Sequence, residues 1–416
     1  MKNWMGRQCR HKSVYFLFFL ISAVFCIFAF WISGPACAAA ETPAGAIKAM
    51  AGKNDAVLVS TESGEAVFSH NSRKKLAPAS ALKVLTALAA LHYLGPDYRF
   101  PTEFYRTQTD DLLIKGYGDP MLVSEAVSDI AKVLKSRIDR VQNIVLDGTY
   151  FKNPVDVPGV AADTEQPYNA PSGALCVNFN TINFKTRNGR IVSAEPQTPM
   201  LPVALSRIKE KNLSAGRVLL SDHFGETLVY AGQLFEHFLT QAGITVSGRI
   251  REGALKPQKA DLIYRHASEY PLTEITRRLF KYSNNYMANQ VLLAAGAAVY
   301  GPPATLEKGV TLLRRYCQKQ LGITDIELAE GSGISRKNRA SAAMFDRILA
   351  EFAGYYELMP NSGNIYYKTG TLDGIQTRVG YIKSGTGLYR FVILLNTKGK
   401  RTEPILAEIK KLIQEQ

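Results

Sequence analysis

Beyond its first forty residues, the hydrophobic pattern of the chain is dominated by a run of small and apolar residues from Pro78 to Leu94. The run is made of strong helix formers, has a proline before its first turn and stops at Gly95-Pro96. A helix that is apolar on all sides is normally buried. We therefore predict a buried helix that carries Ser80 and Lys83, three residues apart, on one face near its N-terminus.

The patterns on either side of this run predict a protein with both helices and strands. Residues 56–60 and 66–68 alternate around a polar turn and predict a β-hairpin, and a second hairpin joins 379–382 to 389–396. Helical periodicity predicts six further helices, at 123–138, 226–242, 271–293, 306–321, 344–352 and 404–416. Shorter strands are predicted at 112–116, 143–147 and 244–250. The stretch 153–202, rich in Pro, Gly, Asn and Thr, predicts a small, mostly β insertion.

The first forty residues predict a targeting segment. Four basic residues and no acidic one precede an almost wholly apolar run at 14–32, and small residues at 36–40 offer cleavage sites. We predict cleavage after Ala40 and an exported protein, periplasmic or otherwise extracytoplasmic. The apolar run is also long enough to span a bilayer, so an uncleaved membrane anchor is the alternative.

Charge and cysteine content narrow the choice of partners. The formal charge of +14 becomes about +10 without the targeting segment, which suits association with an anionic wall polymer or membrane surface. No basic tract interleaved with aromatics is present, so we set nucleic acid aside. Beyond the targeting segment only Cys176 and Cys317 remain. Two separate buried thiols are favoured over a bridge between them.

Candidate chemistry begins with Ser80 and Lys83. A hydroxyl needs a base to become a nucleophile, and burial lowers the pKa of a lysine so that it can serve as that base. The same Ser-x-x-Lys spacing occurs at 72–75 and 206–209, in charged surroundings where a solvated face explains it. Taken alone, the Ser80 copy is also consistent with a helix-capping serine beside a snorkelling lysine.

Two later motifs decide between these interpretations. Ser283-Asn284-Asn285 stands at the start of a predicted helix, and Lys368-Thr369-Gly370 occurs once, just before the second hairpin. A Lys-Thr-Gly on an edge strand can direct a cation and a hydroxyl at a carboxylate, while the glycine lets a ligand approach the backbone. Ser-x-x-Lys, Ser-x-Asn and Lys-Thr-Gly follow one another in the order expected of penicillin-recognising acyl-serine enzymes.

On these motifs the chain resembles the D-alanyl-D-alanine carboxypeptidase/endopeptidase family, the low-molecular-mass class C penicillin-binding proteins. The resemblance covers essentially the whole mature chain and extends to four further segments, 94–97, 118–120, 170–175 and 331–335. It implies an α/β (α+β) fold: a transpeptidase-like, serine β-lactamase-like domain with an antiparallel sheet flanked by helices and a mostly β insertion. The implied division is a signal peptide at 1–40, the transpeptidase-like domain at 41–104 and 261–416, and inserted material at 105–260.

The resemblance also implies a role for each motif. Lys83 would take the proton of Ser80, which would attack the carbonyl between two terminal D-alanines. The backbone N–H groups of Ser80 and Thr371 would stabilise the oxyanion. Ser283 would relay a proton to the leaving amine, Asn285 would orient the substrate amide, and Lys368 and Thr369 would hold the carboxylate, with Gly370 beside them.

Further implications concern ligands and partners. An aspartate in the insertion would meet the free amino group of diaminopimelate; Asp163 is the best match, with Glu165 as a neighbouring acid that could substitute. The implied partners are peptidoglycan peptides, with β-lactams as covalent inhibitors. No cofactor and no metal is implied.

Rival functions are few. The chain has no G-x-S-x-G, H-E-x-x-H or C-x-x-C motif, so other hydrolase classes find no support. A β-lactamase would share all three motifs, but the large insertion favours the peptidase. A catalytically weak wall-binding protein is the alternative from another class.

Overall fold

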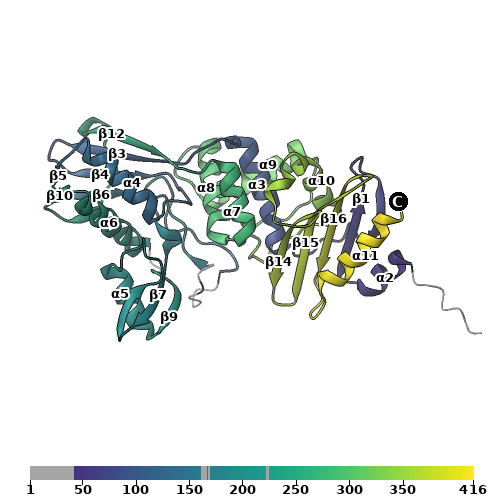
Figure 1. The fold of residues 1–416 in the computed structure, drawn as a ribbon. Coiled ribbons are helices and arrows are strands. Elements are labelled where there is room, and N and C mark those ends of the chain that lie inside the picture. The colour runs from purple at the N-terminus through teal and green to yellow at the C-terminus, as the bar shows by residue number, and fades with distance from the viewer. Residues whose placement is uncertain (1–41, 161–165, 167–168, 222–223) are drawn as a thin grey trace, which may run out of the picture.

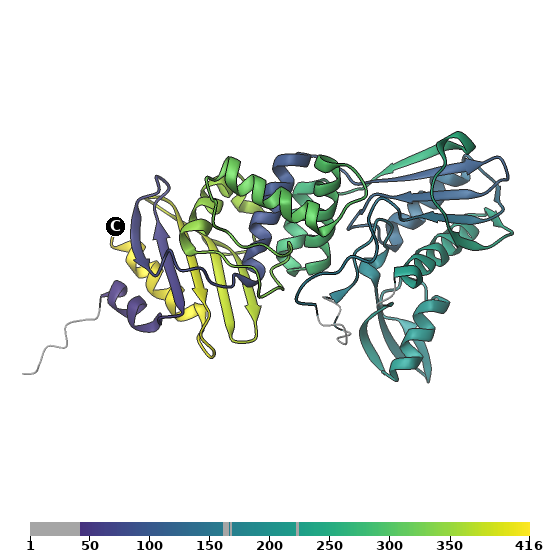
Figure 2. The ribbon, with the colours of Figure 1, turned by 180° about the vertical axis from the view of Figure 1, so that it is seen from behind.

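The computed structural model describes residues 42–160, 166, 169–221 and 224–416. Two regions lie side by side (Figures 1 and 2): one built from both chain ends, the other from the middle of the chain. The first region contains a six-stranded antiparallel sheet in the order β13-β14-β15-β16-β1-β2. Its strands are β1 (Asp55–Ser60), β2 (Ala66–His70), β13 (Asn361–Ser362), β14 (Ile365–Leu372), β15 (Ile375–Ser384) and β16 (Gly387–Leu395). Both predicted hairpins are confirmed.

Two terminal helices cover one face of this sheet. They are α2 (Pro43–Met50) and α11 (Thr402–Gln414), which lie next to each other in both ribbon views. Apolar residues of both helices form one core with the outward face of β1 and β16, as the periodic pattern at the C-terminus predicts. One face of the sheet is therefore covered by α2 and α11, which come from opposite ends of the described chain.

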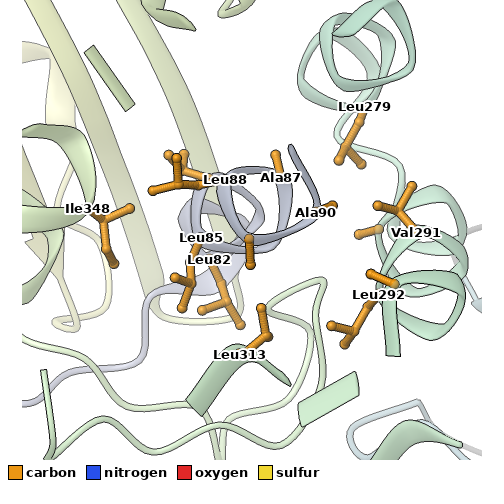
Figure 3. Close-up of a cluster of buried hydrophobic side chains, with 14 of the residues drawn as sticks. Leu82, Leu85, Ala87, Leu88, Ala90, Leu279, Val291, Leu292, Leu313 and Ile348 are labelled. Carbon is orange, nitrogen blue, oxygen red and sulfur yellow. The ribbon is translucent and has the colours of Figure 1, made fainter. Parts of the chain in front are cut away.

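The other face carries a helical layer around the predicted central helix. That helix begins with a 3-10 turn, η1 (Ala79–Leu82), and continues as α3 (Lys83–Leu94). Every residue of α3 from Lys83 to Leu91 is buried, as its composition predicts. Figure 3 shows Leu82, Leu85 and Leu88 among apolar side chains of the neighbouring helices. Those helices are α7 (Leu272–Tyr282), α8 (Asn285–Tyr300), α9 (Leu306–Gln320) and α10 (Ala342–Phe352), the last followed by the 3-10 helix η5 (Ala353–Leu358).

The prediction of a single helix at 271–293 is wrong. The segment 271–293 is two helices, because Ser283 ends α7 in the left-handed conformation, with a φ of +49°. Asn284 then caps α8 by accepting a hydrogen bond from the backbone N–H of Met287. The apolar periodicity continues across the break, which is why the pattern alone joined the two helices.

The second region holds a five-stranded sheet in the order β11-β6-β4-β3-β12. Its strands are β3 (Pro101–Thr107), β4 (Leu112–Gly116), β6 (Ile144–Asp147), β11 (Ile250–Glu252) and β12 (Ala260–Ala267). Helices α4 (Ser124–Lys135) and α6 (Phe224–Gln241) share its apolar core. The predicted strand at 244–250 is two short strands, β10 (Thr245–Val246), paired with β5 (Arg140–Val141), and β11. The predicted limits of the insertion, 105–260, stay a prediction.

A smaller three-stranded sheet completes this region. It contains β7 (Thr181–Arg187), β8 (Arg190–Ser193) and β9 (Ala215–Leu219), with β7 in the centre, and α5 (Pro202–Lys211) beside it. Short 3-10 turns, η3 (Asn178–Asn180) and η4 (Pro257–Lys259), precede β7 and β12. Cys176 and Cys317 are separate buried thiols, as favoured. Among the residues described here, no helix is both long and apolar enough to cross a membrane.

Candidate active site

Ser80 lies on the first turn of the central helix, half-buried, where three segments approach one another. Its neighbour Ala79 has a φ of +48°. A Cβ atom on Gly333 would lie 1.9 Å from the carbonyl oxygen of Ala79, and one on Gly370 would lie 2.7 Å from the backbone nitrogen of Ser80. The two glycines therefore let a loop and a strand press against the backbone that carries the hydroxyl.

Lys83 contacts Ser80 from the following turn of the helix and is fully buried. Its Nζ is 2.9 Å from Ser80 Oγ, 2.7 Å from Asn285 Oδ1 and 2.7 Å from the carbonyl oxygen of Ser332. The last two atoms can only accept hydrogen bonds. A neutral amine would give its two N–H groups to them, and its lone pair would then face the hydroxyl of Ser80.

Electrostatics favours that neutral form. Burial lowers the pKa of Lys83 well below its usual value, and the positive charge of Lys368 lowers it further. The carboxylate of Glu330 acts in the opposite direction and raises the pKa, but it is the smallest of the three effects. Lys83 is thus suited to take up a proton.

Glu330 is a residue of this site that the sequence analysis did not identify. It is fully buried and organises the loop that supplies the Ser332 carbonyl. Its oxygens accept hydrogen bonds from three backbone N–H groups and two side-chain amides: Ser332 N at 2.6 Å, Gly333 N at 2.7 Å, Ser335 N at 3.3 Å, Asn338 Nδ2 at 2.7 Å and Asn289 Nδ2 at 3.4 Å. Because every partner is a donor, the arrangement suits an ionised carboxylate. The only signal in the sequence was a charged residue next to the Gly-Ser-Gly segment.

Ser283 and Lys368 form a second hydroxyl–amine pair near the first. Lys368 Nζ donates to Ser283 Oγ at 2.8 Å and to the carbonyl oxygen of Thr369 at 2.5 Å. Lys368 is 1% exposed, and burial lowers its pKa to about 8. The left-handed turn between α7 and α8 places the Ser283 hydroxyl there, while Asn285, two residues on, reaches Lys83.

Strand β14 lies beside Ser80, and part of its outer edge is not paired with another strand. Its outer neighbour β13 pairs only with Ile365 and Tyr366, so residues 368–372 pair on one side, with β15. Alternate backbone groups of this stretch face away from the sheet and can bond an extended ligand. Thr371 lines the cleft, and Thr369 is exposed on the same strand.

Four of the nine predicted site residues line the cleft, and Lys83 and Lys368 form hydrogen bonds to two of them. Its volume is about 690 Å³, and Ser80, Ser283, Asn285 and Thr371 line it. Gly159 and Asn169 of the middle region also line it. Asp163 and its neighbour Glu165 lie outside the described residues. Within the described part of the chain, no group of three or more His, Cys, Asp or Glu side chains could hold a metal ion.

Comparison with solved structures defines the class of fold. The structure is similar to penicillin binding protein 4 from Haemophilus influenzae, with a TM-score of 0.72, 21% identity and coverage of 89% of this chain and 98% of that one. A predatory peptidoglycan endopeptidase from Bdellovibrio bacteriovorus has a TM-score of 0.50 at 17% identity, with coverage of 86% and 90%. The fold is that of the penicillin-binding proteins, as predicted.

Comparison with protein families gives the identity. The model of the D-Ala-D-Ala carboxypeptidase 3 (S13) family matches residues 43–224 and 211–359, and the chain belongs to that family. It is 26% identical to a D-alanyl-D-alanine carboxypeptidase of an Actinomadura species, over 82% of this chain and 77% of the relative. A second such carboxypeptidase, from Haemophilus influenzae, is 23% identical over 77% and 80%. The resemblance found in the sequence is confirmed, and the chain is a member of a peptidase family.

Proposed function

We propose that this protein is an exported, penicillin-binding D-alanyl-D-alanine carboxypeptidase and endopeptidase that works through an acyl-serine intermediate. The observation that carries the proposal is the 2.9 Å contact between Ser80 Oγ and the Nζ of a fully buried Lys83. An accessible hydroxyl next to a dry amine is the arrangement that nucleophilic catalysis needs.

Acylation follows from these contacts. Lys83 removes the proton of Ser80 as Oγ bonds to the carbonyl carbon between two terminal D-alanines. The backbone N–H groups of Ser80 and Thr371 hold the resulting oxyanion. When the C–N bond breaks, Ser283 passes a proton to the leaving amine. Water then attacks the ester and releases the peptide together with the serine hydroxyl.

Substrate binding uses the open edge of β14. Lys368 and Thr369 hold the terminal carboxylate of the substrate, and Asn285 bonds its amide. Gly370 lets β14 pack directly against η1, because a side chain there would collide with Ser80 and Ala79, and this brings the edge of the strand next to the Ser80 hydroxyl. This arrangement suits an extended peptide laid along the strand.

We assign the free amino group of diaminopimelate to Asp163, from the match to the family pattern. The natural ligands are then peptidoglycan stem peptides and cross-links. β-Lactams are covalent inhibitors in this scheme, and related solved structures include penicillin binding protein 4 with a β-lactam and an endopeptidase acylated by penicillin G. Export by the N-terminal segment and peripheral association with wall or membrane belong to the same proposal.

Acylation by penicillin tests the central step. Mass spectrometry of a digest should find the adduct on the peptide that contains Ser80, and Ser80→Ala should abolish it, whereas Ser72→Ala should not. An adduct on Ser72 or Ser206 would refute the assignment. Rapid release of hydrolysed penicillin would favour a β-lactamase instead, and acylation without cleavage of any muropeptide would favour a wall-binding relative.

A further inference from the structure

A second cleft, of about 800 Å³, lies on the far side of the turn between α7 and α8. Ser283 and Asn285 line both this cleft and the one that contains Ser80. One further wall comes from the middle region, including Arg217 of β9 and Phe179 of η3, and another from α7 and the segment before it. One ligand can therefore extend from the catalytic serine across the turn and into the second cleft.

Aromatic rings give this cleft surfaces for an apolar chain. Tyr282, directly before the turn, is 64% exposed and is among the four large apolar side chains that are exposed in the described part of the chain. Tyr270 lies under the guanidinium of Arg278, which is 4.0 Å from the ring centroid. Exposed rings at the mouth of a cleft are a feature of ligand sites, because they can bury much apolar surface at little cost in side-chain freedom.

A strained segment forms part of the cleft wall. Asn178, Phe179 and Asn180 have successive φ values of +50°, +59° and +53°. The Asn178 side chain accepts from the backbone N–H of Ser124 at 2.9 Å, and the Phe179 ring packs edge-on against Tyr286. A left-handed phenylalanine is costly, and such strain tends to be kept where the backbone shapes a functional site.

The lining holds two arginines and three acids, Glu125, Glu195 and Glu269, so its polar groups suit a peptide that carries both carboxylates and an ammonium group. Arg217 bonds Glu195 and Thr181, and Arg278 pairs with Glu274 at 2.9 Å. An arginine has five N–H donors, more than one carboxylate partner occupies. Asn284 adds an amide at the end nearest Ser283. The cleft thus combines groups of both charges and an amide with aromatic faces.

We propose that the second cleft binds the leaving half of a cross-linked substrate, that is, the second stem peptide attached to the amine that Ser283 protonates. This inference rests on the proposed function, which places the acyl half along β14 and the leaving amine at Ser283. Whatever is attached to that amine continues past Ser283 and Asn284, toward the aromatic faces and the arginines. A lone D-alanine would not reach them.

Two substrates with the same acyl half but different leaving groups test the proposal. One is a stem peptide that ends in D-Ala-D-Ala, and the other is a cross-linked dimer. Tyr282→Ala and, separately, Arg217→Ala should each lower kcat/KM for the dimer by about tenfold and leave the D-Ala-D-Ala substrate within about twofold. The matched controls are Leu262→Ala and Arg190→Ala, exposed residues of the middle region outside the cleft, which should change neither rate.

Equal losses on both substrates would overturn the proposal, because the cleft would then support the catalytic turn or bind the acyl half. Unchanged dimer cleavage in both variants would also overturn it. Binding of the isolated leaving peptide to Ser80→Ala protein gives an independent measurement by calorimetry, in which Tyr282→Ala should weaken the affinity about tenfold. Loss of penicillin acylation in the unmodified protein would instead indicate failure of the proposed function, and the binding measurement would still decide the role of the cleft.

Discussion

The two regions that meet at the cleft containing Ser80 differ in which charged groups they bury. In the region built from both chain ends, Lys83, Lys368 and Glu330 are all almost completely buried. In the middle region, cations that pair with acids stay at the surface, such as Arg251, which is 54% exposed beside Asp111, and Arg217, which is 35% exposed beside Glu195. The first region therefore buries two amines next to hydroxyls, whereas the middle region buries acids, such as Asp119 and Asp147, and leaves its cations accessible.

This difference suggests a division of labour. Catalysis by an amine base requires a dry environment, because only desolvation and a nearby like charge keep the amine neutral. Recognition of a variable peptide requires accessible charges that can exchange water for ligand. We expect changes in the first region to affect every substrate, and changes in the second to affect only some of them.

Removal of the buried amine should have the largest effect. Lys83→Met keeps the length and apolar character of the side chain but cannot accept a proton. Acylation by penicillin should slow by at least about two orders of magnitude, measured by stopped-flow or timed mass spectrometry. Lys75→Met, at a surface site, is the control and should acylate normally. A near-normal rate for Lys83→Met would place the base elsewhere.

Replacement of Glu330 should have the next largest effect. Glu330→Gln loses the buried charge and cannot accept all five donors, so we expect acylation to fall about tenfold or more and unfolding to become easier by on the order of 3 kcal/mol. The carboxylate raises the pKa of Lys83, so its removal should move the acid limb of the acylation rate to lower pH. Glu327→Gln, an exposed control on the same stretch, should change neither property. An unmoved acid limb would limit Glu330 to a structural role.

The pH dependence should report Lys368. Its pKa of about 8 means that its charge is lost as the pH rises through that value, and with it the attraction for a substrate carboxylate. The kcat/KM for a peptide that ends in D-Ala-D-Ala should therefore fall above about pH 8, by up to about tenfold per pH unit. The same peptide with an amidated C-terminus lacks the carboxylate and should not show this limb. An identical basic limb for both peptides would assign it to another group.

The smallest effect is expected in the middle region. Asp163→Ala should lower kcat/KM several-fold for a substrate with the free amino group of diaminopimelate, since an ion pair in contact with water contributes on the order of 1 kcal/mol. An N-acetylated analogue should be almost unaffected. The nearby Asp156→Ala provides a control for general changes of the loop. Equal losses on both substrates would mean that Asp163 supports the loop and does not bind the peptide.

Much of the architecture could be predicted from local patterns. The apolar run after Pro78 indicated a buried helix because no face of it could remain in water, and the two hairpins followed from strand periodicity around polar turns. The order of the three motifs indicated the family. The domain division placed the first and last strands in one domain, but their pairing and register depend on contacts between residues more than three hundred positions apart.

The sequence by itself predicted most of the long helices, both hairpins of the first sheet and the order of the motifs, and hence the family; it did not predict α2, α5, β3 or β12. Only the tertiary structure decided the break at Ser283, the contacts of Lys83 with Asn285 and Ser332, and the role of Glu330. The physical reason is that the state of a buried charge depends on what surrounds it in space. Residues 83, 285 and 332 are distant in the chain, and their atoms meet only when the helix, the turn and the loop pack together.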